Sequence, residues 1–159
     1  MTEVCVVHVG NVKESFYKEA LAEYAKRLSA FCDFSEKEIK ESPLSDGMSE
    51  KEISAALEKE ADAVLSAIPK RAYVVALCVE GKQTTSEGFA KLLERGAQTG
   101  GKLCFIIGSS YGLSQRVKAA ADERLSFSQM TFPHRLMRVI LSEQIYRGFT
   151  ILAGKQYHK

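Results

Sequence analysis

The sequence lacks any apolar run long enough to cross a membrane. No segment approaches the roughly 18 uninterrupted apolar residues that a membrane-spanning helix needs. The first residues, Met1-Thr2-Glu3, lead directly into a strand-like run and carry neither the basic segment nor the cleavage site of a secretory signal. We therefore expect a soluble, cytoplasmic protein with no membrane partner.

The residue spacing that metal centres and disulfide frameworks require is also missing. The four cysteines are widely separated and form no C-x-x-C motif, and the three histidines are not paired at metal-ligand spacing. Three of the cysteines lie in apolar strand-like runs, where a thiol behaves as a small hydrophobic group. The cysteines are Cys5, Cys32, Cys78 and Cys104. We expect core thiols and no bound metal.

The common motifs of hydrolytic enzymes are absent as well. There is no Ser-His-Asp order, no pair of carboxylates and no H-E-x-x-H. The loop from Gly108 to Gly112 lacks both the Lys-Ser/Thr ending of a P-loop and the G-x-G-x-x-G spacing of a dinucleotide site. Its glycines let the backbone approach a flat or anionic ligand. A simple strand-to-helix turn is the alternative interpretation.

The length and composition favour one compact domain. The chain has 159 residues, of which 45% are hydrophobic and 26% charged. Such a chain can bury one substantial core but is too short for two ordinary domains. We therefore predict a single domain over residues 1–159.

Apolar strand-like runs alternate with amphipathic helical patterns, which indicates an α/β fold with a mostly parallel sheet. Strands are predicted at 4–9, 32–40, 73–79, 103–107 and 124–128. The first predicted helix has Phe16, Ala20, Tyr24 and Leu28 on one face. Further helices are predicted over 49–68, 86–93, 114–121 and 133–152.

One helix start has a clear capping signature. Ser49-Glu50-Lys51-Glu52 is a capping box. It opens a helix with an apolar stripe formed by Ile53, Leu57, Ala61, Val64 and Ile68. The many acidic residues between 33 and 62 flank this stripe, so we interpret them as a solvated helix face and not as a cation site.

The most informative segment runs from Leu125 to Arg135, because it ends a strand, forms a polar turn and starts a helix. Pro133 suits the first helical position, where its missing N–H costs nothing. In a parallel sheet, this turn lies at the same edge as the turns after Leu77 and Ile107. Polar groups between apolar residues suit it to enclosing a heterocycle. We expect these three strand ends to converge on one ligand.

Positive charge is concentrated near the end of the sequence. Residues 133–159 hold five Arg or Lys against one Glu, whereas residues 1–132 hold 17 basic and 19 acidic residues. In the last helix, Arg135, Arg138, Ser142 and Tyr146 fall on one face. The opposite apolar stripe faces the sheet or a second subunit. The cations suggest an anionic partner such as RNA, although an ordinary solvated face is the alternative.

Several longer motifs of the sequence form a specific set. They are Phe105-Ile106-Ile107-Gly108, Tyr111-Gly112-Leu113, the whole of Leu125–His134, Arg138-Val139, Glu143-Gln144-Ile145-Tyr146-Arg147 and Tyr157-His158-Lys159. Taken together, they resemble the motifs of one family, the RlmH-type SPOUT methyltransferases. This family methylates N3 of a pseudouridine in a stem-loop of large-subunit (23S) ribosomal RNA.

The resemblance implies a single-domain α/β knot with helices on both faces of the sheet, a C-terminal trefoil knot and an obligate homodimer. It also implies S-adenosylmethionine as the methyl donor, with no metal. The residues that it assigns to the cofactor are Leu77, Gly108, Phe127, Ser128, Gln129, Met130, Thr131 and Phe132. One departure is Ser109, because the family commonly has a second glycine there.

The resemblance also places the C-terminal Tyr157, His158 and Lys159 at the pocket of a neighbouring subunit. We expect His158, with Tyr157, to contact the target base, and His134 to be the second candidate for handling its proton. The plain alternatives are a helix-cap role for His134 and a disordered terminus for His158. Arg135, Arg138 and Lys159 are the predicted RNA contacts.

The substrate would then be ribosomal RNA, presented by an assembled ribosome, because so small a chain has no separate RNA-binding domain. Two other functions remain open from the sequence. They are a non-enzymic RNA-binding module and an α/β nucleotide-binding hydrolase.

Overall fold

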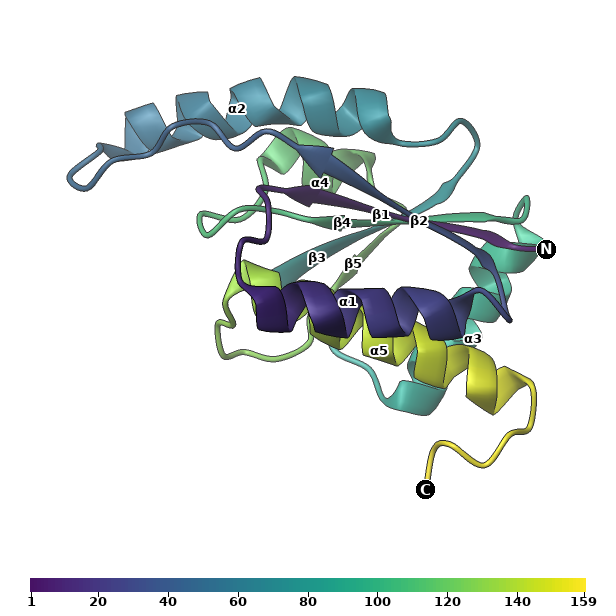
Figure 1. The fold of residues 1–159 in the computed structure, drawn as a ribbon. Coiled ribbons are helices and arrows are strands. Elements are labelled where there is room, and N and C mark those ends of the chain that lie inside the picture. Colours follow the sequence, from purple (N-terminus) through teal and green to yellow (C-terminus); the bar gives the residue numbers. More distant parts are fainter.

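The computed structural model describes residues 1–159 as one five-stranded sheet with helices on both sides (Figure 1). All pairings are parallel, and the strand order is β2-β1-β4-β3-β5. The strands are β1 (Glu3–Val9), β2 (Asp33–Ile39), β3 (Tyr73–Lys82), β4 (Lys102–Ile107) and β5 (Glu123–Leu125). The helices are α1 (Ser15–Leu28), α2 (Glu50–Ala67), α3 (Ser86–Gln98), α4 (Gln115–Ala120) and α5 (His134–Leu152). The predicted fold class is confirmed.

Two apolar cores cover the two faces of the sheet. On one face, side chains of α1, α3 and α5 pack against β1, β3 and β4 around the fully buried Phe105. On the other face, α2 and α4 pack through Ala61, Val64 and Val117. The central strands are therefore buried on both sides, which explains their continuous apolar runs. None of the helices combines the length and apolar character that a membrane crossing requires.

The strand-and-helix predictions agree with the structure except at particular ends. The strand predicted at 124–128 ends at Leu125, because the N–H of Ser126 donates to the carbonyl of Lys82 and the chain then leaves the sheet. The predicted stripe on α1 is wrong at Phe16, which is 61% exposed. The prediction is confirmed at Leu28, which is fully buried, and the other buried residue of this helix is Leu21. Helix α5 starts at His134, one residue after the predicted Pro133.

Helix α5 is enclosed on more sides than its sequence predicts. It lies between α1 and α3 on one face of the sheet (Figure 1). Arg138 and Ser142 were predicted on an exposed face, available to RNA or else simply solvated, and both are buried. That prediction is wrong because a helix with neighbours on both sides and a sheet behind it has no wide face left for solvent.

Because all five strands are parallel, their carboxyl ends lie at one edge of the sheet, as predicted. The segment after β5 then runs along this edge from β3 toward β1. At its far end, Nε of Arg135 donates to the carbonyl of Asn11, which follows β1. The segment thus crosses the ends of the central strands.

The N-cap half of the predicted capping box is present at the start of α2, while the Glu52 carboxylate accepts the hydroxyl of Ser49 at 3.1 Å and not its backbone N–H. The hydroxyl of Ser49 accepts the N–H of Glu52 at 3.2 Å. We expect Ser49→Ala to lower the free energy of unfolding by about 1 kcal/mol, because a first-turn N–H loses its partner. Urea unfolding followed by circular dichroism, at one fixed protein concentration, measures this change.

Ser54→Ala is the matched control, since Ser54 is exposed within the same helix and caps nothing. Its effect should be within about 0.5 kcal/mol of zero. Equal losses for the two variants would mean that the cap contributes nothing specific.

Candidate functional site

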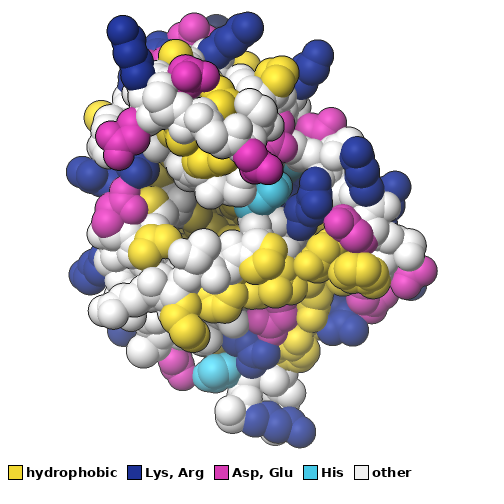
Figure 2. All heavy atoms as spheres, turned by 90° about the vertical axis from the view of Figure 1, so that its left-hand side faces the viewer, with side chains coloured by type: hydrophobic (Ala, Val, Ile, Leu, Met, Phe, Trp, Pro, Cys, Tyr) yellow, Lys and Arg dark blue, Asp and Glu magenta, His cyan; other side chains and the backbone are white.

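The three predicted strand ends do converge on one cavity of about 320 Å³. Its wall comes from the end of β3 (77–80), the loop after β4 (107–113) and the segment after β5 (125–132), with side chains of α4 and α5. Figure 2 shows this edge of the molecule as a hollow with hydrophobic side chains inside and charged side chains around it. A cavity of this size and mixed lining suits a small-molecule ligand.

The loop after β4 folds back tightly on Gly108. A Cβ added at Gly108 would lie 2.3 Å from the carbonyl oxygen of Gly112, so no side chain fits there unless the loop opens. The N–H of Gly112 donates to the carbonyl of Ser109 at 2.9 Å, and Gly112 itself has a φ of +83°. The loop is therefore tightly folded, a geometry that both the ligand-loop interpretation and a simple strand-to-helix turn allow.

Ser109, the departure from the family pattern, is buried in the same loop. Its hydroxyl accepts the N–H of Tyr111 at 3.3 Å. The side chain therefore has a partner within the loop, although Ser109 also lines the cavity.

The segment after β5 is held in shape by its own serines. The hydroxyl of Ser126 donates to the carbonyl of Ser128 at 2.9 Å, and the hydroxyl of Ser128 accepts the N–H of Met130 at 3.0 Å. At its end, the carbonyl of Pro133 accepts the N–H of Met137 and starts α5. The predicted polar turn is confirmed, and it is ordered, because side-chain oxygens bond backbone groups that a loose loop would leave to water.

The structure brings together seven of the eight predicted cofactor residues. The cavity is lined by Leu77, Gly108, Phe127, Ser128, Met130, Thr131 and Phe132. Gln129 is exposed and does not line it. The reason is local, because the turn around Ser128 directs this one side chain outward.

A pair of opposite charges in the cavity wall was not predicted. Nζ of Lys118, on α4, donates to the carboxylate of Glu80, and both residues line the cavity. This hydrogen bond holds the pKa of Glu80 below its ordinary value. Of these two residues, only Glu80 lies near a predicted strand end. Lys118 is 38 residues away in the sequence, and no local motif connects it to Glu80.

His134 lies where α5 starts, in the wall of the same cavity. Its Nε2 is buried and has no hydrogen-bond partner. Burial lowers the pKa of the imidazole, and the nearby Arg135 and Arg138 act in the same direction. Burial therefore favours the neutral imidazole near pH 7, although the nearby Glu41 acts in the opposite direction.

The predicted RNA contacts on α5 are already engaged with carboxylates. Arg135 pairs with Glu14 at 3.2 Å, and Arg138 pairs with Glu36 at 3.1 Å. The Arg138 side chain is only 8% exposed. RNA binding by Arg135 and Arg138 stays a prediction. The structure does not favour it, because each arginine already pairs with a carboxylate.

The C-terminal residues lie away from the cavity of their own chain. The hydroxyl of Tyr157 donates to Glu143 at 3.2 Å, and Nε2 of His158 lies 2.8 Å from Glu87 at the start of α3. Lys159 is exposed. None of the three lines the cavity.

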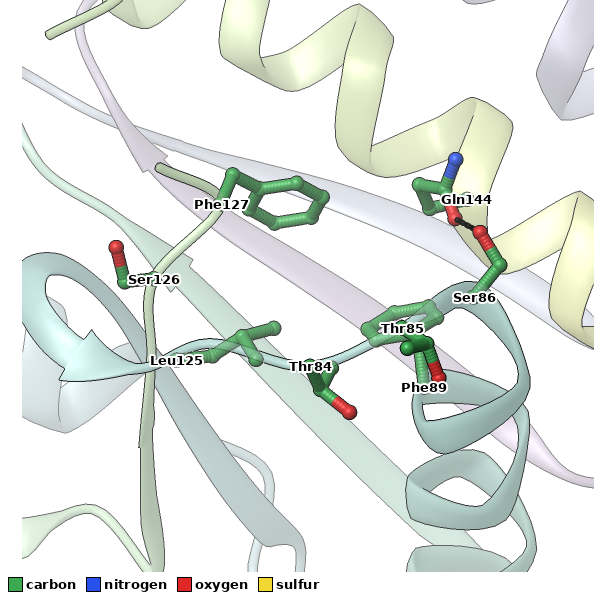
Figure 3. A pocket seen from close by; sticks show the side chains of 8 residues that line it. All are labelled: Thr84, Thr85, Ser86, Phe89, Leu125, Ser126, Phe127 and Gln144. Carbon is green, nitrogen blue, oxygen red and sulfur yellow. Dashed lines mark hydrogen bonds between the residues drawn. The ribbon is translucent and has the colours of Figure 1, made fainter. Parts of the chain in front are cut away.

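A smaller pocket of about 200 Å³ lies next to the cavity (Figure 3). The two hollows share Leu125, Ser126 and Phe127. The hydroxyl of Ser86 donates to the side-chain oxygen of Gln144 at 3.0 Å across its far side. Hydroxyl groups and the rings of Phe89 and Phe127 thus enclose a mixed polar and aromatic space.

Comparison with known proteins then identifies the fold family. The profile of the family described as "Predicted SPOUT methyltransferase" matches residues 2–158. The chain belongs to the SPOUT methyltransferase family. The resemblance of the sequence motifs to this family is confirmed.

This SPOUT methyltransferase is also similar to proteins named ribosomal RNA large subunit methyltransferase H. Relatives from Bacillus pumilus and Clostridium botulinum are 43% and 45% identical to it, each over 98% of this chain and 99% of the relative. A relative from Streptococcus thermophilus is 46% identical over 99% of both chains. The similarity therefore extends over the whole sheet and both helix layers.

We expect the imidazole of His134 to titrate below 6.5, its ordinary value, in an NMR titration of the folded protein. The unfolded chain then binds more protons than the folded one below that pH, so the free energy of unfolding falls as the pH drops through this range. His134→Gln should reduce this loss. A pKa at or above that of the urea-unfolded protein would contradict the assignment.

Proposed function

We propose that this SPOUT methyltransferase transfers a methyl group from S-adenosylmethionine to large-subunit ribosomal RNA. The observation that carries the proposal is the cavity that three strand ends form at one sheet edge, in a chain of this family. The name of the relatives, ribosomal RNA large subunit methyltransferase H, supports the RNA substrate. By the resemblance, the acceptor atom is N3 of a pseudouridine.

The residues present fit S-adenosylmethionine. The cavity has apolar walls, including Leu77 and Phe132, which suit the adenine ring. Backbone groups of the two turns are available for hydrogen bonds to its edges. The paired charges of Glu80 and Lys118 match a zwitterionic amino-acid end, and the unpartnered Nε2 of His134 leaves one buried polar group for a ligand or substrate.

The bound donor supplies a methyl group that is already activated by its positively charged sulfur. The chain has two tasks, which are to hold the acceptor nitrogen in line and to take its imide proton. Alignment alone contributes up to roughly 7–11 kcal/mol. The neutral His134 of the same cavity and the partner-supplied tail with His158 are the candidate proton acceptors.

We also propose that the active unit is a homodimer. Helices α1 and α5 lie side by side on the outside of the molecule (Figure 1). They expose two large apolar side chains, Phe16 and Leu152. Phe16 stands at the start of α1 and Leu152 at the end of α5, so the proposed dimer rests on the family resemblance and these two residues are only candidate contacts.

A C-terminal knot is part of the proposal too. The end of β5 crosses β3 so closely that a Cβ on Gly81 would lie 2.7 Å from the carbonyl carbon of Leu125. From this crossing, the chain passes to the face of the sheet that α1 and α3 cover, on the other side from α4. There α5 lies between α1 and α3. This crossing is consistent with a knot, because α5 ends enclosed by elements that precede it.

The first test is the cofactor. We expect Gly108→Trp to abolish binding of S-adenosylmethionine in isothermal titration calorimetry, since the indole must displace the backbone of Gly112. The wild-type protein should bind at micromolar strength, about −8 kcal/mol. Ser54→Trp, on the exposed face of α2, controls for added bulk and should bind normally.

The titration also separates the other two functions. Affinity for ATP in place of S-adenosylmethionine would support a nucleotide-binding hydrolase. RNA binding without affinity for either would support a non-enzymic module. Unchanged cofactor binding by Gly108→Trp would show that the cofactor site is elsewhere.

The second test asks whether the site is shared between subunits. Deletion of residues 157–159 should preserve cofactor binding but abolish methylation. A heterodimer of this truncated chain with Gly108→Trp has one intact pocket faced by one intact tail. Co-expressed with two affinity tags and purified, it should recover about half of wild-type activity per dimer.

Each parent homodimer is the control, and both should be inactive. An inactive heterodimer would show that the tail serves its own chain. A protein that sediments strictly as a monomer would also rule out the shared site.

The third test identifies the product. Ribosomal RNA from cells with and without this chain, compared by mass spectrometry, should differ by one methyl group on a 23S pseudouridine. Purified ribosomes and protein-free RNA, offered as substrates in parallel, show whether the assembled particle in the cytoplasm is required. Identical RNA from the two cell types would contradict the proposed function.

A further inference from the structure

A separate groove of about 160 Å³ runs between α3 and β5 and is lined with cations. Its walls hold Lys82, Lys91, Arg95 and Arg124, with Glu123 as the single carboxylate. Four positive charges against one negative charge leave the groove strongly basic, in a chain whose net charge is only +2.

Most of these cations have no internal partner. Arg95 pairs with Glu123 at 3.0 Å. Lys82, Lys91 and Arg124 are exposed and form no ion pair within the chain. The arginines of α5, in contrast, all pair with carboxylates. The groove therefore offers positive charge without carboxylate partners, which the arginines of α5 do not.

The cations stand in two rows that come from different elements. Lys91 and Arg95 are one turn apart on α3, so their side chains share a face. Lys82 is paired in register with Leu125, which places it next to Arg124 on the adjoining strand. Two rows of charge along a groove suit a linear chain of phosphates better than one small anion.

The groove is continuous with the proposed reaction site. It shares Thr84 and Leu125 with the small pocket of Figure 3. That pocket in turn shares Leu125, Ser126 and Phe127 with the main cavity. A polyanion lying in the groove thus passes beside the segment that forms the wall of the cavity.

We infer that this groove binds the phosphate backbone of the substrate RNA next to the methylated nucleotide. The inference rests on the proposed function. It assigns the main electrostatic contact with the RNA to the cations of the groove, and not to Arg135 and Arg138 of α5. Backbone contacts of this kind set position and affinity and carry no base sequence.

The test variant replaces the three unpaired cations together, as Lys82→Gln, Lys91→Gln and Arg124→Gln. The control removes the same charge from the opposite layer, as Lys51→Gln, Lys59→Gln and Lys70→Gln, all exposed and without ion pairs. A second control, Lys82→Arg, Lys91→Arg and Arg124→Lys, keeps the charge. Thermal unfolding and S-adenosylmethionine titration establish that each variant is folded and has an intact cavity.

Ribosomal large subunits from cells lacking this chain serve as substrate, and protein-free 23S ribosomal RNA serves as the binding probe. For the groove variant, we expect KM to rise about tenfold or more with kcat within about twofold of wild type. The slope of log binding constant against log salt should become shallower by about 2, because roughly three phosphate contacts are lost. Both control variants should behave as wild type.

Equal KM and equal salt dependence in the groove variant and wild type would overturn the inference. Weaker binding to subunits with unchanged binding to protein-free RNA would also overturn it, because a ribosomal protein would then occupy the groove. If wild-type protein methylates no RNA, the proposed function fails. The salt dependence of RNA binding then still decides whether the groove contacts phosphate.

Discussion

The parallel alignment of β3, β4 and β5 is the constraint on which the rest of the structure depends. Helices on both faces bury these strands, so every connection that leaves them must do so at an edge. Their carboxyl ends share one edge, and the three turns that follow form one cavity there. Residues far apart in sequence, such as Leu77 and Phe127, are thus neighbours in the wall of this cavity.

Close backbone contacts keep these turns in place. Gly108 lies against Gly112, and Gly81 lies against Leu125, at distances that exclude any side chain. Short hydrogen bonds from Ser126 and Ser128 then fix the last turn. The site is therefore built mainly from backbone geometry, which is suited to holding a ligand in one orientation and contributes little acid–base chemistry of its own.

A basic segment of this molecule indicates an anionic partner only where its cations have no carboxylate partner within the chain. Arg135, Arg138 and Arg147 make the end of the sequence basic, yet each faces a carboxylate from another turn or element. Lys82, Lys91 and Arg124 lie in segments that are not conspicuously basic, and the fold places them along one groove. Unpaired cations attract an anionic partner more strongly than paired ones, because the field of a paired cation is largely cancelled locally.

The sequence by itself determined the order in which strands and helices follow one another along the chain. It also determined the cap at Ser49 and the three turns that line the cavity. Each of these depends on local periodicity, local hydrogen bonding or the topology that parallel strands require. Tertiary structure alone decided that Arg138 is buried, that Phe16 is exposed, that Lys118 reaches Glu80 and that the tail lies away from its own cavity. These outcomes depend on which elements pack together, and residues far apart in sequence carry no local record of their neighbours.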